Sequence, residues 1–325
     1  MYSPQVCFFR PLDDSIDTRF LYYWFRGNEF RLQAAGVKSQ TDMADYINLA
    51  DVRALSITLP GRSVQSGIAD VVGAPDEKIE SNRRLQQAAH DLVQAIFAST
   101  FERDGWPWES AGLTAALGDH LAVVETGRRP PGGVRGLNEG VPSIGAESIK
   151  RAGEFDFSKL KFVPREFFSA MRRGVLTDRD VLLYKDGGTP GNFEPHVSMV
   201  GQGFPFDEAA INEHVYRLRA KPPFSQDFLY AWLSAPATME EMRRRGTGVA
   251  IPSLNSPNLR TMPFPQPNLE TLQAAQEETE PVMTTLLQSA AESKTLADLR
   301  DALLPELLSG RLRVPVVEEL VEAAT

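Results

Sequence analysis

The chain has 325 residues, enough for about two domains of ordinary size, and 42% of them are hydrophobic and 24% charged. These values are typical of a globular protein that buries a core, and they exclude a fully disordered chain, a fibre or a disulfide-stapled mini-protein. The single cysteine, Cys7, can form neither an internal disulfide nor a zinc site alone. No apolar stretch approaches the ~18–20 residues of a membrane span, and no secretory signal is visible. We therefore expect a cytoplasmic, metal-free protein with no membrane contact.

The net charge of −9 is unevenly distributed along the chain. Residues 105–265 carry 19 basic and 18 acidic side chains, so the middle is close to neutral. Residues 1–104 carry 11 basic against 14 acidic side chains, and residues 266–325 carry 4 against 11. The acidity therefore lies at the two ends. This distribution does not exclude DNA as a partner, although it argues against binding by electrostatics alone.

The first long helix is predicted from about Val64 to Phe97, where most apolar residues recur at alternating spacings of four and three. We expect Gly73 and Pro75 to kink or interrupt it near its start. The apolar spacing slips phase around Asn82. Asn82 therefore lies either on the apolar stripe, where a polar residue fixes the register of a helix pair, or on the exposed face.

A region of different composition follows, from about Gly105 to Pro265, and it is rich in glycine and proline. Short runs such as LAVVE and DVLLY are typical of β-strands, and a helix is predicted near residues 224–245. This pattern indicates a mixed α/β domain with long loops. Long loops on a compact scaffold often carry function.

The second long helix is predicted from about Leu269 to Leu308, with Gly310 as its stop. A strict alternation of four- and three-residue spacings runs from Leu272 to Ser293, and a leucine seam then continues it. A narrow apolar stripe of this length needs a partner stripe. We therefore predict that the two long helices pair as an antiparallel coiled coil. The alternative is two unrelated helices packed on globular domains.

The chain also repeats itself. The motif FLYYW of residues 20–24 returns as FLYAW in residues 228–232, and residues 47–55 match residues 254–262. In each copy a proline and a long helix follow, an order that is not expected by chance. The first copy is short, with about 60 residues before its helix against about 160 in the second. The expected fold class is therefore α+β, with one complete mixed α/β domain, two long helices and the C-terminal part of a second such domain.

A series of short motifs runs through almost the whole chain, up to Arg313. The motifs are Trp108, Leu117–Asp119, Thr126–Gly127, Asp180–Leu183, Lys185–Gly187, Asn212–Val215, Gly248–Asn255 and Leu299–Leu312. Together with the repeat, and in this order, they resemble the specificity subunit of type I restriction-modification systems. In that family two target-recognition domains each read half of a split DNA site. Two conserved helices form the spacer on which methyltransferase subunits dock, and translocating restriction subunits join later.

The resemblance implies a division of the chain. Residues 1–62 would be the C-terminal remnant of a first target-recognition domain, 63–100 the first spacer helix, 101–267 a complete recognition domain, 268–313 the second spacer helix and 314–325 an acidic tail. The missing part of the first domain would be supplied by a second copy in a homodimer of half-subunits, by another chain, or not at all. S-adenosylmethionine, ATP and Mg would serve partner subunits, with no cofactor in this chain.

No motif makes the chain itself a catalyst. A Walker-type phosphate-binding loop is absent. The run KPPF at residues 221–224 resembles the N/D-P-P-Y/F signature of amino-methyltransferases, yet lysine cannot accept the hydrogen bond of the target amino group. Residues 292–294 imitate part of a nuclease site without an acidic partner motif. The four histidines lack metal-ligand spacing. We interpret His214 as a buried structural hydrogen-bonding residue, with a contact role as the alternative.

Base edges are read by side chains such as arginine, which pairs with guanine, and asparagine or glutamine, which pair with adenine. Candidates for this role in the loops of the middle domain are Arg128, Arg129, Arg135, Lys185, Asn192 and Gln202. Cations better suited to the phosphates are Lys150, Arg151, Arg172, Arg173, Arg243, Arg244 and Arg245. Candidates for docking a methyltransferase subunit are Leu296, Leu299, Leu303 and Leu307. The alternative for each charged candidate is an ordinary solvated surface charge.

The resemblance therefore implies a sequence-specific DNA-recognition subunit. Its expected partners are double-stranded DNA, methyltransferase subunits and restriction subunits. The alternative is a truncated scaffold or assembly modulator that binds the methyltransferase subunit only.

Overall fold

The computed structural model describes residues 7–37, 39–40, 45–101, 114–201, 204–248 and 251–314. The chain divides into two compact units, one made of residues 1–81 with 293–325 and the other of residues 82–292. Each long helix contributes a part to each unit. The core of each unit therefore contains side chains from both helices.

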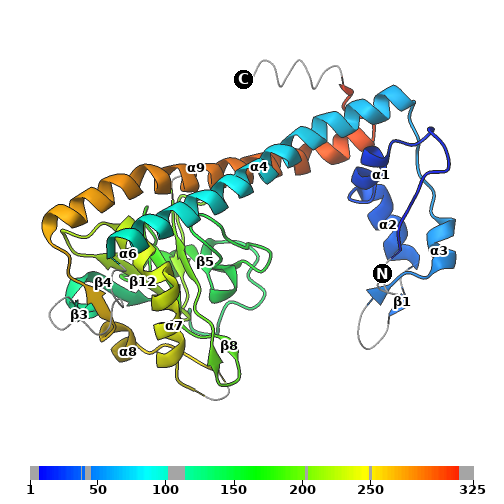
Figure 1. Ribbon diagram of the computed structural model, residues 1–325. Coiled ribbons are helices and arrows are strands. Elements are labelled where there is room, and N and C mark those ends of the chain that lie inside the picture. Colours follow the sequence, from blue (N-terminus) through cyan, green and yellow to red (C-terminus); the bar gives the residue numbers. More distant parts are fainter. Residues whose placement is uncertain are drawn as a thin grey trace. The chain divides into compact units, whose positions relative to one another are not determined.

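Two 40-residue helices, α4 (Arg62–Phe101) and α9 (Leu269–Leu308), form the predicted antiparallel pair (Figure 1). In the first unit Ile68 of α4 shares an apolar core with Leu307 of α9. In the second unit Phe97 of α4 shares a core with Leu272 of α9. The beginning of one helix thus meets the end of the other in both units.

Two polar or irregular positions of α4 are accommodated by this pairing. The helix runs through Gly73 and Pro75, so these residues do not interrupt it, which was one of the two expectations for them. Val72 and Ile79 on either side of the proline are buried. Asn82 is only 1% exposed and therefore lies on the buried seam. Its Nδ2 donates a hydrogen bond to Glu292 Oε2 at 2.7 Å.

The first unit adds short elements to the helix pair. They are α1 (Thr18–Trp24), α2 (Asn28–Val37), β1 (Ser39–Gln40), β2 (Asp45–Tyr46) and α3 (Leu49–Ala54). Phe20 and Tyr23 of α1 lie in the core between α4 and α9. The Tyr23 hydroxyl donates to Asp76 Oδ2 at 2.9 Å, and Arg300 of α9 pairs with the same carboxylate. This carboxylate therefore links three helices.

The second unit is built around an antiparallel sheet whose strands lie in the order β10-β7-β12-β4. The strands are β4 (Leu121–Thr126), β7 (Val181–Tyr184), β10 (Val197–Met199) and β12 (Val215–Ala220). The first two confirm the strands predicted from LAVVE and DVLLY. A second sheet, in the order β11-β5-β6, contains β5 (Val141–Ile144), β6 (Lys161–Val163) and β11 (Ala210–Ile211). Two strand pairs complete the unit: β3 (Thr114–Ala116) with β13 (Pro263–Pro265), and β8 (Gly188–Thr189) with β9 (Asn192–Phe193).

The helices of this unit pack on the sheets and on one another. They are α5 (Arg165–Ser169), α6 (Gln226–Ser234), α7 (Pro236–Arg245) and α8 (Ser256–Arg260), with 3-10 turns at Leu117–His120 and Ala146–Ser148. The expectation of a single helix over residues 224–245 is wrong, because the helix is interrupted at Ala235. Ala235 is extended, with φ −64° and ψ 139°, as the residue before a proline tends to be. Trp232 of α6 is fully buried in the core.

The internal repeat is visible in the local structure of both units. Asn48 Oδ1 caps α3 and Asn255 Oδ1 caps α8, each by accepting a backbone N–H three residues on. The helices that carry the repeated aromatic motif are anchored alike. Gln65 Oε1 of α4 accepts the backbone N–H of Asp17 before α1 at 2.8 Å, and Gln276 Oε1 of α9 accepts that of Ser225 before α6 at 2.5 Å.

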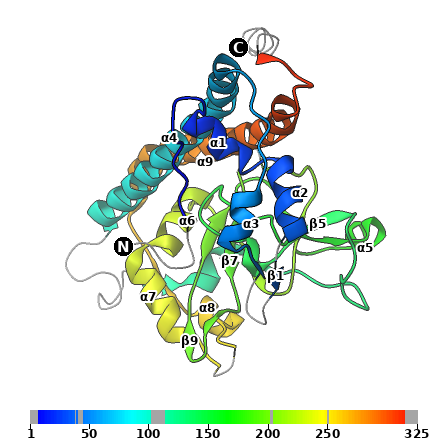
Figure 2. The ribbon, with the colours of Figure 1, turned by 90° about the vertical axis from the view of Figure 1, so that its right-hand side faces the viewer.

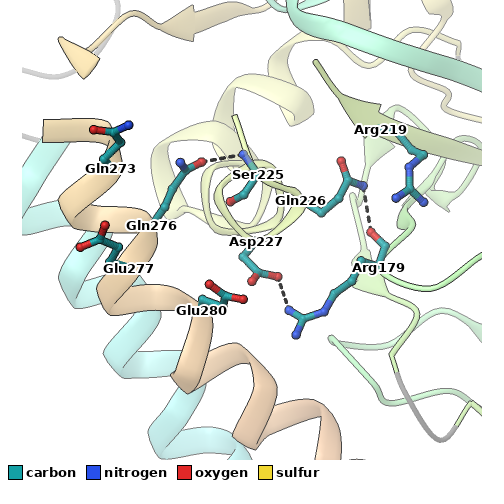
Figure 3. A pocket seen from close by; sticks show the side chains of 9 residues that line it. All are labelled: Arg179, Arg219, Ser225, Gln226, Asp227, Gln273, Gln276, Glu277 and Glu280. Carbon is teal, nitrogen blue, oxygen red and sulfur yellow. Dashed lines mark hydrogen bonds and ion pairs between the residues drawn. The ribbon is translucent and has the colours of Figure 1, made fainter. Parts of the chain in front are cut away.

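Figure 3 shows the second of these anchors in the notch between α6 and α9. Beside it, Arg179 Nη1 pairs with Asp227 Oδ1 at 2.5 Å, and Arg179 Nη2 donates to Thr284 Oγ1 of α9 at 2.9 Å. Burial raises the pKa of Asp227, while Arg179 opposes that shift. These contacts hold the sheet, α6 and α9 together as one body.

Candidate nucleic-acid interface

The strand register brings several connections of the four-stranded sheet to one end. Thr126, the last residue of β4, pairs with Tyr216 near the start of β12, and Val215 pairs with Tyr184, the last residue of β7. The start of β10 lies beside the end of β7. The residues that follow or precede these strands therefore emerge together. We define the sheet-end surface as residues 127–129, 185–196 and 212–214.

A row of charged side chains crosses this surface. Arg129 Nε lies 2.6 Å from Glu213 Oε1, which in turn lies 3.4 Å from His214 Nε2. His214 Nδ1 lies 2.8 Å from Asp186 Oδ2, and Lys185 Nζ lies 3.7 Å from the same oxygen. The row joins the connections after β4, after β7 and before β12. All five side chains retain some exposure, so they are fixed by one another and still reach solvent.

Close backbone packing brings two further arginines to this surface. A Cβ at Gly127 would lie 1.6 Å from the carbonyl oxygen of Ile211, so only glycine fits there. A Cβ at Gly174 would lie 2.9 Å from the Cα of Gly127. The turn that carries the exposed Arg172 and Arg173 therefore packs against the start of the β4–β5 connection, next to Arg128 and Arg129.

The β8–β9 hairpin presents Asn192, which is exposed, beside α7 (Figure 2). Arg243 of α7 pairs with Glu194 at 2.7 Å and holds the hairpin in place. Arg244 and Arg245 both pair with Glu241 at 2.5 Å, and Arg245 Nη1 also donates to the Thr261 hydroxyl at 3.0 Å. The charges of these arginines are therefore already engaged within the fold.

The remaining charged candidates lie elsewhere. Arg135 is exposed in the β4–β5 connection. Lys150 and Arg151 are exposed beside the edge strand β10, and Ser198 of that strand donates a hydrogen bond to the Arg151 carbonyl oxygen. Gln202 lies outside the described residues. The structure thus brings Arg128, Arg129, Arg172, Arg173 and Lys185 to one end of the sheet. It places Asn192 on the hairpin that follows β7, and Lys150 and Arg151 at a neighbouring edge.

The four leucines considered for partner docking differ in exposure. Leu299 is 44% exposed, whereas Leu296 and Leu303 are half-buried. Leu307 is 2% exposed and lies in the core that α4 and α9 share. Leu307 therefore stabilises the helix pair itself, and Leu299 is the member of the seam that is open to solvent.

Three residues of the charged row were not among the candidates: Asp186, Glu213 and His214. The interpretation of His214 as buried is wrong, because 40% of its side chain is exposed. The signal lay in the two family motifs at residues 185–187 and 212–215. The sequence does not show that these motifs meet in space, since antiparallel pairing of β7 with β12 brings them together.

The electrostatics of the sheet-end surface follow from these contacts. The hydrogen bond from Arg243 lowers the pKa of the Glu194 carboxyl, and burial lowers the pKa of His196. Among the described residues, no group of three or more histidine, cysteine, aspartate and glutamate side chains is placed to hold a metal ion. In the same part of the chain, no helix is long and apolar enough to cross a membrane.

No family model matches the chain. Over 377 aligned residues the chain is 20% identical to the type I restriction enzyme HindI specificity subunit of Haemophilus influenzae, with 95% of this chain and 81% of that protein covered. The chain is similar to the specificity subunits of type I restriction enzymes.

One solved specificity subunit shares the architecture. The S subunit of the type I restriction-modification system of M. genitalium matches with a TM-score of 0.50 at 17% identity, over 91% of this chain and 74% of that one. The HsdS subunit of Thermoanaerobacter tengcongensis matches with a TM-score of 0.38 at 19% identity, over 92% and 72% of the two chains. The first of these matches confirms the expected mixed α/β fold with two long helices.

Proposed function

We propose that this relative of the specificity subunits is the DNA-recognition subunit of a type I restriction-modification complex and reads one half-site with its sheet-end surface. The observation that carries the proposal is the charged row from Arg129 to Lys185. Base readout requires donors and acceptors whose positions are fixed before the duplex arrives. Ion pairs between three neighbouring connections supply that fixation.

The residues of the surface divide by chemistry. Arg128 and Arg129 suit guanine, because a guanidinium donates two hydrogen bonds to O6 and N7. Asn192, on the exposed edge of the hairpin, suits adenine in the same way. Arg172 and Arg173 lie beside Arg128 and Arg129 and suit the phosphates. Contacts with phosphates set the register of the duplex but do not read its bases.

The chain itself would be non-catalytic. S-adenosylmethionine would be used by the methyltransferase subunits, and ATP and Mg by the restriction subunits. This chain would select the DNA sequence that is bound and would position the duplex for the other subunits.

The helix pair would serve as spacer and docking core. Leu299 is the candidate contact for this role. Its apolar side chain on α9 is 44% exposed to water, and a docked partner would bury it. Replacing Leu299 by Asp should abolish co-purification with the methyltransferase subunit. Leu269→Asp is the matched control, because Leu269 is 55% exposed at the other end of α9. Equal co-purification of both variants would argue against docking at Leu299.

The test of DNA reading is a double variant, Arg128→Gln with Arg129→Gln. It should lose specific affinity for the methylated target, because each good bidentate pair contributes ~1–3 kcal/mol of discrimination. Arg311→Gln is the control, since Arg311 is an exposed arginine paired with Glu306 at 2.6 Å near the end of α9. Unchanged DNA affinity in the double variant would favour the scaffold that binds the methyltransferase subunit only.

The target itself should come from base-resolution mapping of adenine methylation. Cells would express this chain with a methyltransferase subunit and no other specificity gene. A split motif whose halves are inverted copies would show that the mixed domain works twice, in a homodimer of half-subunits. No motif-specific methylation, with both proteins abundant, would contradict the proposed function.

A further inference from the structure

A hollow of about 480 Å³ lies beside the sheet-end surface, between α4 and the edge strand β10. Its polar lining includes Arg83, Gln87 and His90 of α4, Lys150 and Arg151 before the edge strand, and His196 at its start. His196 belongs to the sheet-end surface, and the Tyr184 N–H donates to its carbonyl oxygen at 2.9 Å. The hollow therefore adjoins the surface assigned to DNA.

The wall of this hollow is held rigidly. The backbone N–H of Ala152 donates to the Tyr230 hydroxyl of α6 at 3.3 Å, and that of Gly153 donates to the Met199 carbonyl of β10 at 3.0 Å. A Cβ at Gly153, whose φ is +70°, would lie 2.8 Å from the Cβ of Ala290 on α9. The turn that carries Lys150 and Arg151 is thus fixed to a helix, a strand and a second helix.

The charge of the hollow is positive. Three cations line it, from Arg83, Lys150 and Arg151, against one carboxylate, from Glu154. Within the described part of the chain, none of the three cations has an ion-pair partner; the guanidinium of Arg151 donates instead to the neutral amide of Gln87. Burial lowers the pKa values of His90 and His196, so both rings are neutral near pH 7 and each offers one N–H donor.

We propose that this hollow binds a phosphate group. Unpaired guanidinium groups match phosphate oxygens in charge and in the spacing of their donors, and the neutral histidines and Gln87 supply further hydrogen bonds. The phosphate comes from a phosphodiester of the DNA backbone, where the duplex passes from the sheet-end surface to α4, or from a free phosphate. The DNA source rests on the proposed function, whereas the free-phosphate source does not.

The test uses the full chain and the variant Arg83→Gln with Arg151→Gln. Arg84→Gln is the matched control, because Arg84 is the next residue of α4 and does not line the hollow. For duplex DNA, the slope of log K against log salt should become shallower by ~0.9 for the one phosphate contact that is lost. Titration calorimetry with inorganic phosphate should show binding to the wild type that is about tenfold or more weaker in the double variant.

The two measurements separate the outcomes. A shallower slope in the double variant, but not in Arg84→Gln, identifies a DNA phosphodiester as the occupant. An unchanged slope with weakened binding of inorganic phosphate identifies a free phosphate. If neither quantity changes, the hollow binds no phosphate and the inference is overturned. A wild type that binds no DNA contradicts the proposed function. In that case the calorimetric comparison still shows whether the hollow binds phosphate.

Discussion

His214 Nδ1 lies 2.8 Å from Asp186 Oδ2, and this contact joins the start of β12 to the end of β7. The two residues are 28 positions apart in the chain, yet they meet because Val215 pairs with Tyr184 in the sheet. Glu213 and Lys185 extend the contact on either side. The backbone hydrogen bonds between β7 and β12 thereby fix the positions of the charged groups at the end of the sheet.

Replacing Asp186 by Asn should separate specific from non-specific DNA binding. Removal of a carboxylate from a surface that faces phosphates strengthens non-specific binding, because one repulsion is lost. The affinity for the specific target rises less, because His214 and Lys185 lose the carboxylate that positions them. Partly exposed ion pairs of this kind contribute ~0.2–1 kcal/mol to the stability of the arrangement. The ratio of affinities for target and scrambled duplexes should therefore fall by roughly two- to fivefold. Asp70→Asn, which removes an exposed carboxylate in the first unit, should leave the ratio unchanged.

Local patterns in the sequence predict much of this fold. The four-three spacing of apolar residues predicts both long helices and their pairing, because one stripe must meet another. The spacing does not show which leucines face the partner helix and which face water. Leu299 and Leu307 lie on the same predicted seam, yet one is exposed and the other buried, since α1 covers only the end of the pair.

The candidate site is less predictable, because its parts come from distant segments. Arginines in glycine-rich loops are visible as candidates in the sequence. Whether Arg128 lies near Arg172 depends on the packing of Gly127 against Gly174, which no local pattern encodes. Arg244 and Arg245 look equally suitable in sequence, but Glu241 in the same helix engages both.

The two glutamine anchors should contribute to stability in the same way. Gln276 accepts the N–H of Ser225 and donates from Nε2 to the Pro223 carbonyl at 3.3 Å, and Gln65 does the same for the N–H of Asp17 and the carbonyl of Ser15. Replacing either glutamine by Leu removes the partner of a backbone N–H, which is buried at Asp17 and part-buried at Ser225. The cost is about 1–3 kcal/mol in the free energy of unfolding at a buried group and toward the low end of that range at Ser225. Urea titration measures this loss. Gln273→Leu is the control, because Gln273 is exposed in the same notch of α9; an equal loss there would show that the hydrogen bonds are not the cause.

Asn82 should set the register of the helix pair at some cost in stability. A buried polar residue on an apolar seam favours the one alignment in which its partner is present, here Glu292 at 2.7 Å. Asn82→Leu should leave the free energy of unfolding equal or higher, and it should broaden the set of oligomers seen by light scattering. Asn82→Ala should lower the free energy by about 0.5–1.5 kcal/mol without new oligomers. A leucine variant that is less stable and uniformly assembled would refute the register role.

The stability of the second unit should fall as the pH drops below the ordinary histidine value of 6.5. Burial lowers the pKa of His90, Arg151 acts in the same direction, and Asp91 opposes them. The unfolded chain therefore takes up a proton at a pH where the folded chain does not. The free energy of unfolding decreases with falling pH, by at most ~1.4 kcal/mol per pH unit for each such proton.

The loss of stability caused by histidine protonation is separable from the loss caused by protonation of the carboxylates. The pKa of Asp76 is lowered by its hydrogen bonds with Arg300 and Tyr23 despite its partial burial, so its contribution is lost only below its ordinary value of 3.8. Urea titrations at pH 7.5 and 5.5 thus sample the histidines. His90→Gln should reduce the difference between the two pH values, while His120 and His196, whose pKa values burial also lowers, account for the remainder. A difference that is unchanged in His90→Gln would show that His90 takes up its proton equally in both states.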